Sequence, residues 1–125
     1  MKLNKKGGDQ YMKLLTEELK KQIPALYSQE HVKDPMVHVK FFDPTGSWTW
    51  YATEGEEAEN GDFLFFGYVI GFEAELGYFT LSQLQTAKRG MTGIRALPIE
   101  RDLYFKPCKL SEVKELHNRE HGTQY

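Results

Sequence analysis

The hydrophobic residues of this chain are most concentrated in residues 62–80, which read DFLFFGYVIGFEAELGYFT. Aromatic and β-branched side chains fill the first half of this run, from Phe63 to Phe72, with almost no polar interruption. A short apolar run of this kind is typical of a strand that is buried on both faces, so we expect the central strand of a sheet here. Gly67 and Gly71 predict that the strand is bent, because a missing side chain permits a bulge or the close approach of another backbone.

Two further strands are predicted before this run. The segment Met36–Phe42 alternates between apolar and polar residues, as a half-buried strand does. The residues DPTG at positions 43–46 have the preferences of a tight turn, so a second strand should follow over Ser47–Thr53. The segment Glu54–Asp62 carries five carboxylates and an Asn-Gly pair, which predicts an exposed turn into the central strand. The three strands should form an antiparallel meander.

Three short helices are predicted from their end signals. A threonine and two glutamates open the first, which should run from Thr16 to about Pro24, because proline disfavours helical geometry in the residue before it. The second, over Thr80–Lys88, begins with the spacing of a capping box. The third should be capped by Ser111 and stopped by Gly122.

The remaining segments complete the predicted order. Residues Glu73–Leu76 should form a corner after the central strand, and Leu97–Phe105 should form an edge strand because prolines flank it on both sides. The charges of Glu100, Arg101 and Asp102 favour a partly buried ion pair there. The order is therefore α-β-β-β-α-β-α, which predicts an α+β fold with a twisted antiparallel sheet of about four strands and two or three short helices.

Composition favours one autonomous domain. The chain has 125 residues, of which 40% are hydrophobic and 14% aromatic. This supplies enough apolar surface for a single core and argues against disorder. We expect a flexible basic lead over residues 1–11, a single domain over residues 12–121 and a tail over residues 122–125.

Charge and cysteine content restrict the environment of the protein. The formal net charge is −2. The overall charge therefore gives no non-specific electrostatic attraction to nucleic acid or to an anionic membrane. Cys108 is the single cysteine, no secretory signal is recognisable, and no apolar run has the length of a membrane helix. A cytoplasmic protein without a membrane partner is the resulting expectation.

Four blocks of the sequence resemble a known protein family. They read MKLLTEELKKQIPALYS, VKFFDPTGSWTWYATE, FGYVIGFEAELGYFTLSQL and LPIERDLYFKP, and they lie between Met12 and about Val113. Together they are similar to domain-of-unknown-function family 2958, whose small proteins occur on plasmids, phages and integrative elements of bacteria. The resemblance implies an accessory protein of a mobile genetic element, and it implies no particular reaction or catalytic residue.

The C-terminal segment contains candidate metal ligands. The sequence HNREH at residues 117–121 has the form H-x-x-E-H, which on a helix places two imidazoles on one face, as zinc enzymes require. An enzyme of this type needs a third protein ligand further along the chain, and four residues follow His121. The residue types also allow a small zinc site made of Cys108, His117 and His121. The alternative is a solvated helix end and a buried free thiol.

Two features are candidates for binding a protein partner. Trp48 and Trp50 are of a residue type enriched among binding hot spots, and the alternative is that they cover the sheet beneath a helix. An acidic strip comprises Glu54, Glu56, Glu57, Glu59 and Asp62. This strip could imitate phosphate spacing and occupy the basic channel of a host defence nuclease, and the alternative is an ordinary solvated loop.

Binding of single-stranded nucleic acid is a third hypothesis. Basic residues are available in the lead and at Lys88, Arg89 and Arg95. The aromatic segment 66–72 faintly resembles a base-stacking strand. It is too apolar to leave one face in water, however, and the predicted element order does not suit an RNA-recognition domain. Nucleic acid is therefore the less favoured partner.

The family resemblance, with no cluster of residues that requires a particular reaction, leads us to expect a non-enzymatic accessory protein of a mobile genetic element. It should act by binding a macromolecular partner, such as a host defence nuclease of the CRISPR type. The alternatives are a small zinc-binding protein or hydrolase that uses Cys108, His117 and His121, and a binder of single-stranded nucleic acid. No residue is predicted to be catalytic, and zinc is the single cofactor considered.

Overall fold

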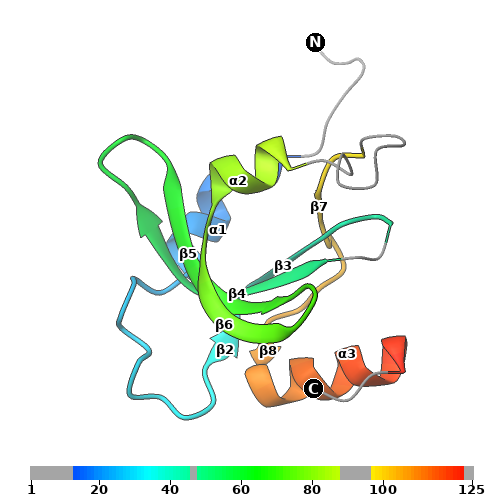
Figure 1. Cartoon of the computed structure of the whole chain (residues 1–125). Coiled ribbons are helices and arrows are strands. Elements are labelled where there is room, and N and C mark those ends of the chain that lie inside the picture. Colours follow the sequence, from blue (N-terminus) through cyan, green and yellow to red (C-terminus); the bar gives the residue numbers. More distant parts are fainter. Residues whose placement is uncertain (1–12, 46–47, 88–96, 123–125) are drawn as a thin grey trace.

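A five-stranded antiparallel sheet forms the centre of the protein (Figure 1). The computed structural model describes residues 13–45, 48–87 and 97–122. Within these ranges the strand order is β6-β5-β4-β3-β7. The strands are β3 (Val39–Phe42), β4 (Thr49–Glu57), β5 (Phe63–Ile70), β6 (Ala74–Thr80) and β7 (Glu100–Arg101). A second, two-stranded antiparallel sheet pairs β2 (Met36–Val37) with β8 (Cys108–Lys109). The predicted α+β class is confirmed.

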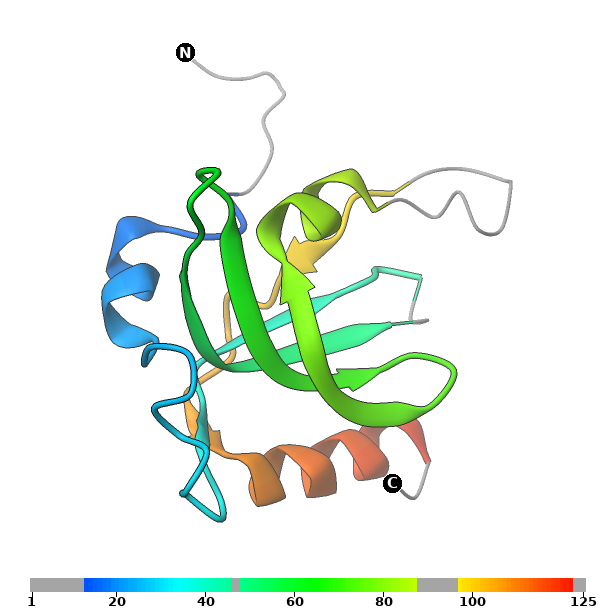
Figure 2. The same ribbon diagram turned by 60° about the vertical axis from the view of Figure 1, so that its left-hand side comes forward.

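Helices cover both faces of the large sheet (Figures 1 and 2). The short helices α1 (Glu17–Gln22) and α2 (Leu81–Thr86) lie over one face, and α3 (Leu110–His121) lies along the other. Among the described residues, no helix is long and apolar enough to cross a membrane.

Two hydrophobic cores follow from this arrangement. On the face towards α1 and α2, the buried rings of Phe41, Phe65 and Phe79 pack with Leu15 and Leu84. The second core lies on the face towards α3. Its buried members are Val37, Tyr51, Tyr68, Ile70, Leu110 and Val113. Because successive residues of a strand point to opposite faces, β5 supplies Phe65 to one core and Tyr68 to the other.

The apolar run 62–80 forms two strands rather than one, and neither is central. Residues 71–73 make a tight turn in which the Gly71 N–H donates to the Glu73 carbonyl at 3.0 Å. This turn folds β6 back against β5, so the expected corner at Glu73–Leu76 is mostly strand. Phe72 lies at the tip with 84% of its side chain exposed. The middle strand of the sheet is β4.

The close approach of another backbone expected at Gly67 is present. A Cβ atom at Gly67 would lie 1.9 Å from the carbonyl oxygen of Tyr51, so no side chain can be accommodated there. The pairing of β4 with β5 shifts register between Ala52 and Glu54, where Thr53 is an extra residue. A bulge of this kind increases the local twist, which explains why the two backbones approach so closely.

Three strand boundaries differ from the predictions. The segment Met36–Phe42 is interrupted at His38, so β2 and β3 belong to different sheets. The acidic segment is not a turn throughout, because β4 continues to Glu57. The predicted strand Leu97–Phe105 contributes only the two residues of β7, although these do form a sheet edge as expected.

The helix ends largely follow the predicted signals. Thr16 caps α1, and Thr80 forms a capping box with Gln83 at the start of α2. Gly122 ends α3 in the left-handed conformation, with a φ of 65°. Ser111 is not the cap of α3. It lies inside the helix and donates its N–H and hydroxyl to the carboxylate of Asp34, at 2.9 and 2.7 Å.

Candidate functional site

A groove of about 350 Å³ lies between the loop after α1 and the strands β5 and β6. Aromatic and aliphatic side chains form most of its walls, with charged groups at the rim. The residues that define it are Tyr27, Glu30, Val32, Phe66, Leu76 and Tyr78. We call it the Tyr27 groove.

The backbone of Tyr27 has a strained conformation. Its φ is 69°, which no other described residue apart from glycine shares. A bulky side chain rarely adopts this left-handed region, which costs about 1–3 kcal/mol and requires the surrounding structure to enforce it. The buried carboxylate of Glu54 does so, because its two oxygens accept hydrogen bonds from the N–H groups of Tyr27 and Gln29, each at 2.8 Å.

The same conformation places Tyr27 beside the aromatic wall of the groove. The ring of Tyr78 lies 4.9 Å from the ring of Phe66, which is its neighbour across β5 and β6. The Tyr27 hydroxyl lies near that of Tyr78 and raises the pKa of Tyr78, because the interaction stabilises its neutral phenol. The wall thus has three aromatic rings, of which Glu54 fixes the backbone of Tyr27 while the pairing of β5 with β6 places Phe66 and Tyr78.

Much of this wall is accessible to solvent. Tyr27 is 61% exposed, Leu76 is 55% exposed and Tyr78 is 52% exposed, and Val32 is also exposed. Single exposed apolar residues are common, but a group of them in a groove marks an interaction surface. The arrangement can bind an apolar segment of a partner, and its aromatic members are of the type found in binding hot spots.

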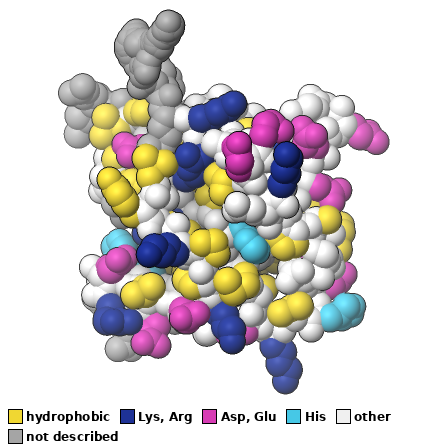
Figure 3. Space-filling view, turned by 180° about the vertical axis from the view of Figure 1, so that it is seen from behind, with side chains coloured by type: hydrophobic (Ala, Val, Ile, Leu, Met, Phe, Trp, Pro, Cys, Tyr) yellow, Lys and Arg dark blue, Asp and Glu magenta, His cyan; other side chains and the backbone are white. Residues whose placement is uncertain are grey.

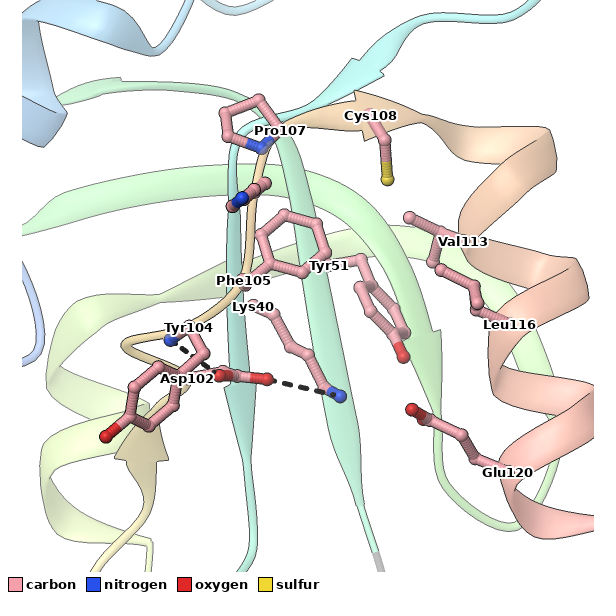
Figure 4. A pocket seen from close by; sticks show the side chains of 11 residues that line it. Lys40, Tyr51, Asp102, Tyr104, Phe105, Pro107, Cys108, Val113, Leu116 and Glu120 are labelled. Atoms are coloured by element: carbon pink, nitrogen blue, oxygen red, sulfur yellow. Dashed lines mark hydrogen bonds and ion pairs between the residues drawn. The ribbon is translucent and has the colours of Figure 1, made fainter.

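A second cavity, of about 370 Å³, lies between α3 and the segment before β8 (Figure 4). We call it the Lys40 pocket. Figure 4 shows the Lys40 ammonium directed into the space between Asp102 and Glu120, near the hydroxyl of Tyr51. Phe105, Val113 and Leu116 supply apolar walls.

The ionisable groups in and beside the Lys40 pocket interact with one another. The Lys40 ammonium lies 3.6 Å from Asp102 and 5.7 Å from the centre of the Tyr51 ring. Asp102 is thus in a partly buried ion pair, but its partner is Lys40 of β3, which the prediction for residues 100–102 did not name. The Tyr51 hydroxyl is 3.0 Å from Nδ1 of His117. Burial raises the pKa of Tyr51 and lowers the pKa of His117 to about 4. At neutral pH the phenol and the imidazole are both uncharged, so neither is prepared to act as a nucleophile or strong base.

The predicted zinc ligands do not form a cluster. His117 is buried against Tyr51, and His121 stacks on it with ring centres 4.0 Å apart while its Nδ1 bonds the His117 carbonyl oxygen at 3.0 Å. Cys108 lies in β8, before the start of α3, where burial raises the pKa of its thiol. Among the described residues, no three or more His, Cys, Asp and Glu side chains could hold a metal ion.

The acidic strip is divided among several structural contacts. Besides the buried Glu54, Glu56 accepts the N–H of Leu26 at 3.2 Å and Glu57 pairs with Lys20 at 3.4 Å. Asp62 binds the N–H and hydroxyl of Ser82, at 3.1 and 2.6 Å. Glu59 is exposed. On the back of the molecule, acidic side chains gather over α1 and the tip of the β4–β5 hairpin (Figure 3).

The two tryptophans are half-buried and stack on each other. Their ring centres lie 5.9 Å apart, and Trp48 also contacts the exposed ring of Phe72 at 5.6 Å. Trp50 packs against the first core. Trp48 covers Gly71, where a Cβ atom would come within 2.3 Å of its ring. Both residues thus have a structural role at this end of the sheet.

The basic residues of the nucleic-acid hypothesis cannot be placed. Lys88, Arg89, Arg95 and the whole lead over residues 1–11 lie outside the described residues. The same is true of the last three residues of the predicted tail.

Sequence reasoning missed the residues that build the Tyr27 groove. Leu76 was expected in a corner, and no role was predicted for Tyr27. No local pattern predicts that a tyrosine adopts a positive φ, since the cause is a carboxylate 27 residues away. The nearest signal was Glu54 itself, which is the first carboxylate of the acidic strip and lies next to the apolar strand sequence.

These features define a small α+β protein with a solvent-accessible aromatic groove. The family model described as "Protein of unknown function (DUF2958)" matches residues 14–122. The chain therefore belongs to this family, as the sequence resemblance indicated. The match extends beyond Val113 and includes the whole of α3. Searches of curated proteins and of solved structures give no match.

Proposed function

We propose that this protein is a non-enzymatic binding protein that holds a macromolecular partner in the Tyr27 groove. The observation that carries the proposal is the pairing of a strained, exposed Tyr27 with a buried carboxylate that fixes its backbone. Strain of this kind tends to concentrate at sites that bind ligands, because folding alone gives no reason to retain it.

The groove has the composition expected of a binding surface. Tyrosine offers a large rigid contact area with few rotatable bonds, so ordering it on binding costs little conformational entropy. Tyr27 and Tyr78 both line the groove, and the ring of Phe66 packs against that of Tyr78. A preorganised aromatic wall reduces the entropy lost on association and so increases affinity.

The ionisable groups at the Lys40 pocket have partners within the protein. The Lys40 ammonium is paired with Asp102, and the Tyr51 phenol is bonded to the buried imidazole of His117 in α3. We therefore place the binding role at the Tyr27 groove instead.

The expected accessory role on a mobile genetic element, including inhibition of a host defence nuclease, remains part of this proposal. We place the contact at the Tyr27 groove rather than at the acidic strip. The reason is that Glu54, Glu56, Glu57 and Asp62 all have partners within the protein. A carboxylate with such partners is less available to imitate a phosphate.

A comparative pull-down tests the proposal. Tagged wild-type protein is incubated with a bacterial lysate beside the variant Leu76→Ser/Tyr78→Ser, which removes two exposed groove side chains. The matched control is Leu103→Ser/Tyr104→Ser, which makes the same changes in the exposed turn after β7. We expect one protein to be recovered with the wild type and the control, and to be lost with the groove variant.

Two results would contradict the proposal. In the first, all three proteins recover the same set of partners, so the groove has no role. In the second, the partner is lost with the control variant and retained with the groove variant. This would locate the binding surface at the turn after β7.

A further inference from the structure

We propose that the partner binds as an additional strand on the outer edge of β6, through an extended segment in which apolar and basic residues alternate. This inference rests on the proposed function and specifies how the Tyr27 groove is used. It follows from the position of β6, from the alternation of its side chains and from the charge along it.

The outer edge of β6 is available for pairing. β6 is the last strand of the sheet order, and Figures 1 and 2 show it at the outer margin of the sheet. In the described residues, β5 is its one strand partner, and no backbone hydrogen bond joins Glu75–Phe79 to any other element. Unpaired N–H and C=O groups on such an edge can bind an extended peptide through main-chain hydrogen bonds.

The two faces of β6 differ in character. Leu76 and Tyr78 lie on the face of the Tyr27 groove, in register with Tyr68 and Phe66 of β5. Glu75 lies on the opposite face, in register with Val69, and it is exposed. An added strand has the same pleat as its neighbour, so its side chains would meet these two faces in turn. One set would contact Leu76 and Tyr78, and the other would lie beside Glu75.

Gly77, in the middle of β6, faces open space on one face of the sheet. A Cβ atom built at Gly77 would have no heavy atom within 4 Å, in contrast to Gly67 opposite it, where the backbone of β4 excludes one. The packing of the protein itself therefore does not require glycine at position 77. Glycine within a strand often marks a place where another backbone approaches, and here the approach would come from outside the protein.

Charge favours a basic partner segment over an acidic one. Glu73 and Glu75 are exposed at the start of β6, and Glu30 lies on the rim of the groove. Lys33, on the same rim, is the one basic residue among those lining the groove. Opposite charges on neighbouring strands stabilise a pair and like charges destabilise it, so lysine or arginine is expected beside Glu75.

The test uses a synthetic probe. A fluorescently labelled octapeptide of alternating Lys and Val is titrated with the full-length protein, and its affinity is compared with that of an octapeptide of alternating Glu and Val. A third peptide with the same composition as the first, but with four Lys followed by four Val, controls for charge alone. We expect the alternating Lys-Val peptide to bind at least about tenfold more tightly than either of the others at low salt.

A charge exchange makes the test specific to β6. In the variant Glu73→Lys/Glu75→Lys the preference should reverse, so that the Glu-Val peptide binds more tightly than the Lys-Val peptide. The control variant Glu18→Lys/Glu115→Lys changes the net charge equally at exposed positions on α1 and α3, and it should keep the wild-type preference.

Several results would overturn the inference. Equal binding of the alternating and block Lys-Val peptides would show attraction by charge without strand pairing. If no peptide binds while the groove variant still loses its partner in the pull-down, the partner is not held as a strand and the proposed function survives. If gel filtration with light scattering shows a dimer that Leu76→Lys dissociates, the occupant of the edge is a second copy of this chain.

Discussion

The carboxylate of Glu54 fixes the backbone of Tyr27 in a left-handed conformation, from a position 27 residues further along the chain. Glu54 is 5% exposed and Tyr27 is 61% exposed, so a buried charge orders a side chain that solvent can reach. The conformation of the loop, and with it the Tyr27 side of the groove, therefore depends on Glu54. This coupling makes the account testable by measurements of stability as well as of binding.

Replacing Glu54 should destabilise the protein and disorder the groove. Glu54→Ala removes two charge-assisted hydrogen bonds and leaves the N–H groups of Tyr27 and Gln29 without their acceptor. We expect the free energy of unfolding to fall by roughly 2–4 kcal/mol in urea denaturation. The control Glu59→Ala, at an exposed position of the acidic strip, should change it by less than about 0.5 kcal/mol. Equal losses in the two variants would contradict the role given to Glu54.

Two glycines on neighbouring strands should respond differently to the same substitution. Gly67→Ala would place a methyl group 1.9 Å from the Tyr51 carbonyl oxygen, and β4 lies in the middle of the sheet, where its backbone has little freedom to move. A loss of about 3 kcal/mol or more in unfolding free energy is expected. Gly77→Ala enters open space and should change stability by less than about 0.5 kcal/mol. Similar values for both would show that the close approach at Gly67 is absent in solution.

Much of the fold could be predicted because its signals are local. The capping residues Thr16 and Thr80, the stop at Gly122 and the alternation of β3 depend on a few neighbouring residues. The division of the run 62–80 into two strands was missed because its turn lacks a typical turn sequence. Phe72 is hydrophobic, yet it lies at the exposed tip of the hairpin.

The candidate site could not be predicted for a related reason. The strain at Tyr27 arises from Glu54, and the groove arises from the pairing of Phe66 with Tyr78. Both are contacts between segments that are distant in sequence, and one sequence alone does not reveal them. Residue type was also a poor guide to exposure, since Glu54 is buried while Leu76 and Tyr78 are not.

Stability should decrease as the pH falls from 6.5 towards 4. Burial lowers the pKa of His117 to about 4 from the ordinary value of 6.5, so in this range the unfolded chain binds a proton that the folded protein excludes. The contribution of His117 is complete well above pH 6.5, and on the order of 3 kcal/mol is lost by pH 4. Burial also lowers the pKa of His38, so the two histidines act in the same direction.

The His117→Gln variant separates the two histidines. Urea denaturation between pH 7 and pH 4 should give a shallower loss of stability for this variant than for the wild type. The difference between the two curves is the contribution of His117. Parallel curves would mean that the imidazole is solvated in the folded state.

Zinc should not stabilise the protein. Nδ1 of His117 bonds the Tyr51 hydroxyl and Nδ1 of His121 bonds a backbone carbonyl, and among the described residues no third His, Cys, Asp or Glu side chain joins the two stacked rings in a group that could hold a metal ion. A ligand that binds only the folded state raises its Tm in proportion to its affinity. We expect an unchanged Tm on adding equimolar zinc, in the wild type and in His121→Ala alike. A saturable increase in the wild type that His121→Ala abolishes would restore the metal site.

The most direct test of the binding role is amide hydrogen exchange with and without the alternating Lys-Val octapeptide. Strand addition predicts slower exchange in β6, at Glu75–Phe79, because the outward-facing N–H groups of this edge would gain acceptors, while exchange in α3 stays the same. Protection confined to α3 and the turn after β7, around the Lys40 pocket, would contradict the account. So would unchanged exchange throughout the protein at saturating peptide.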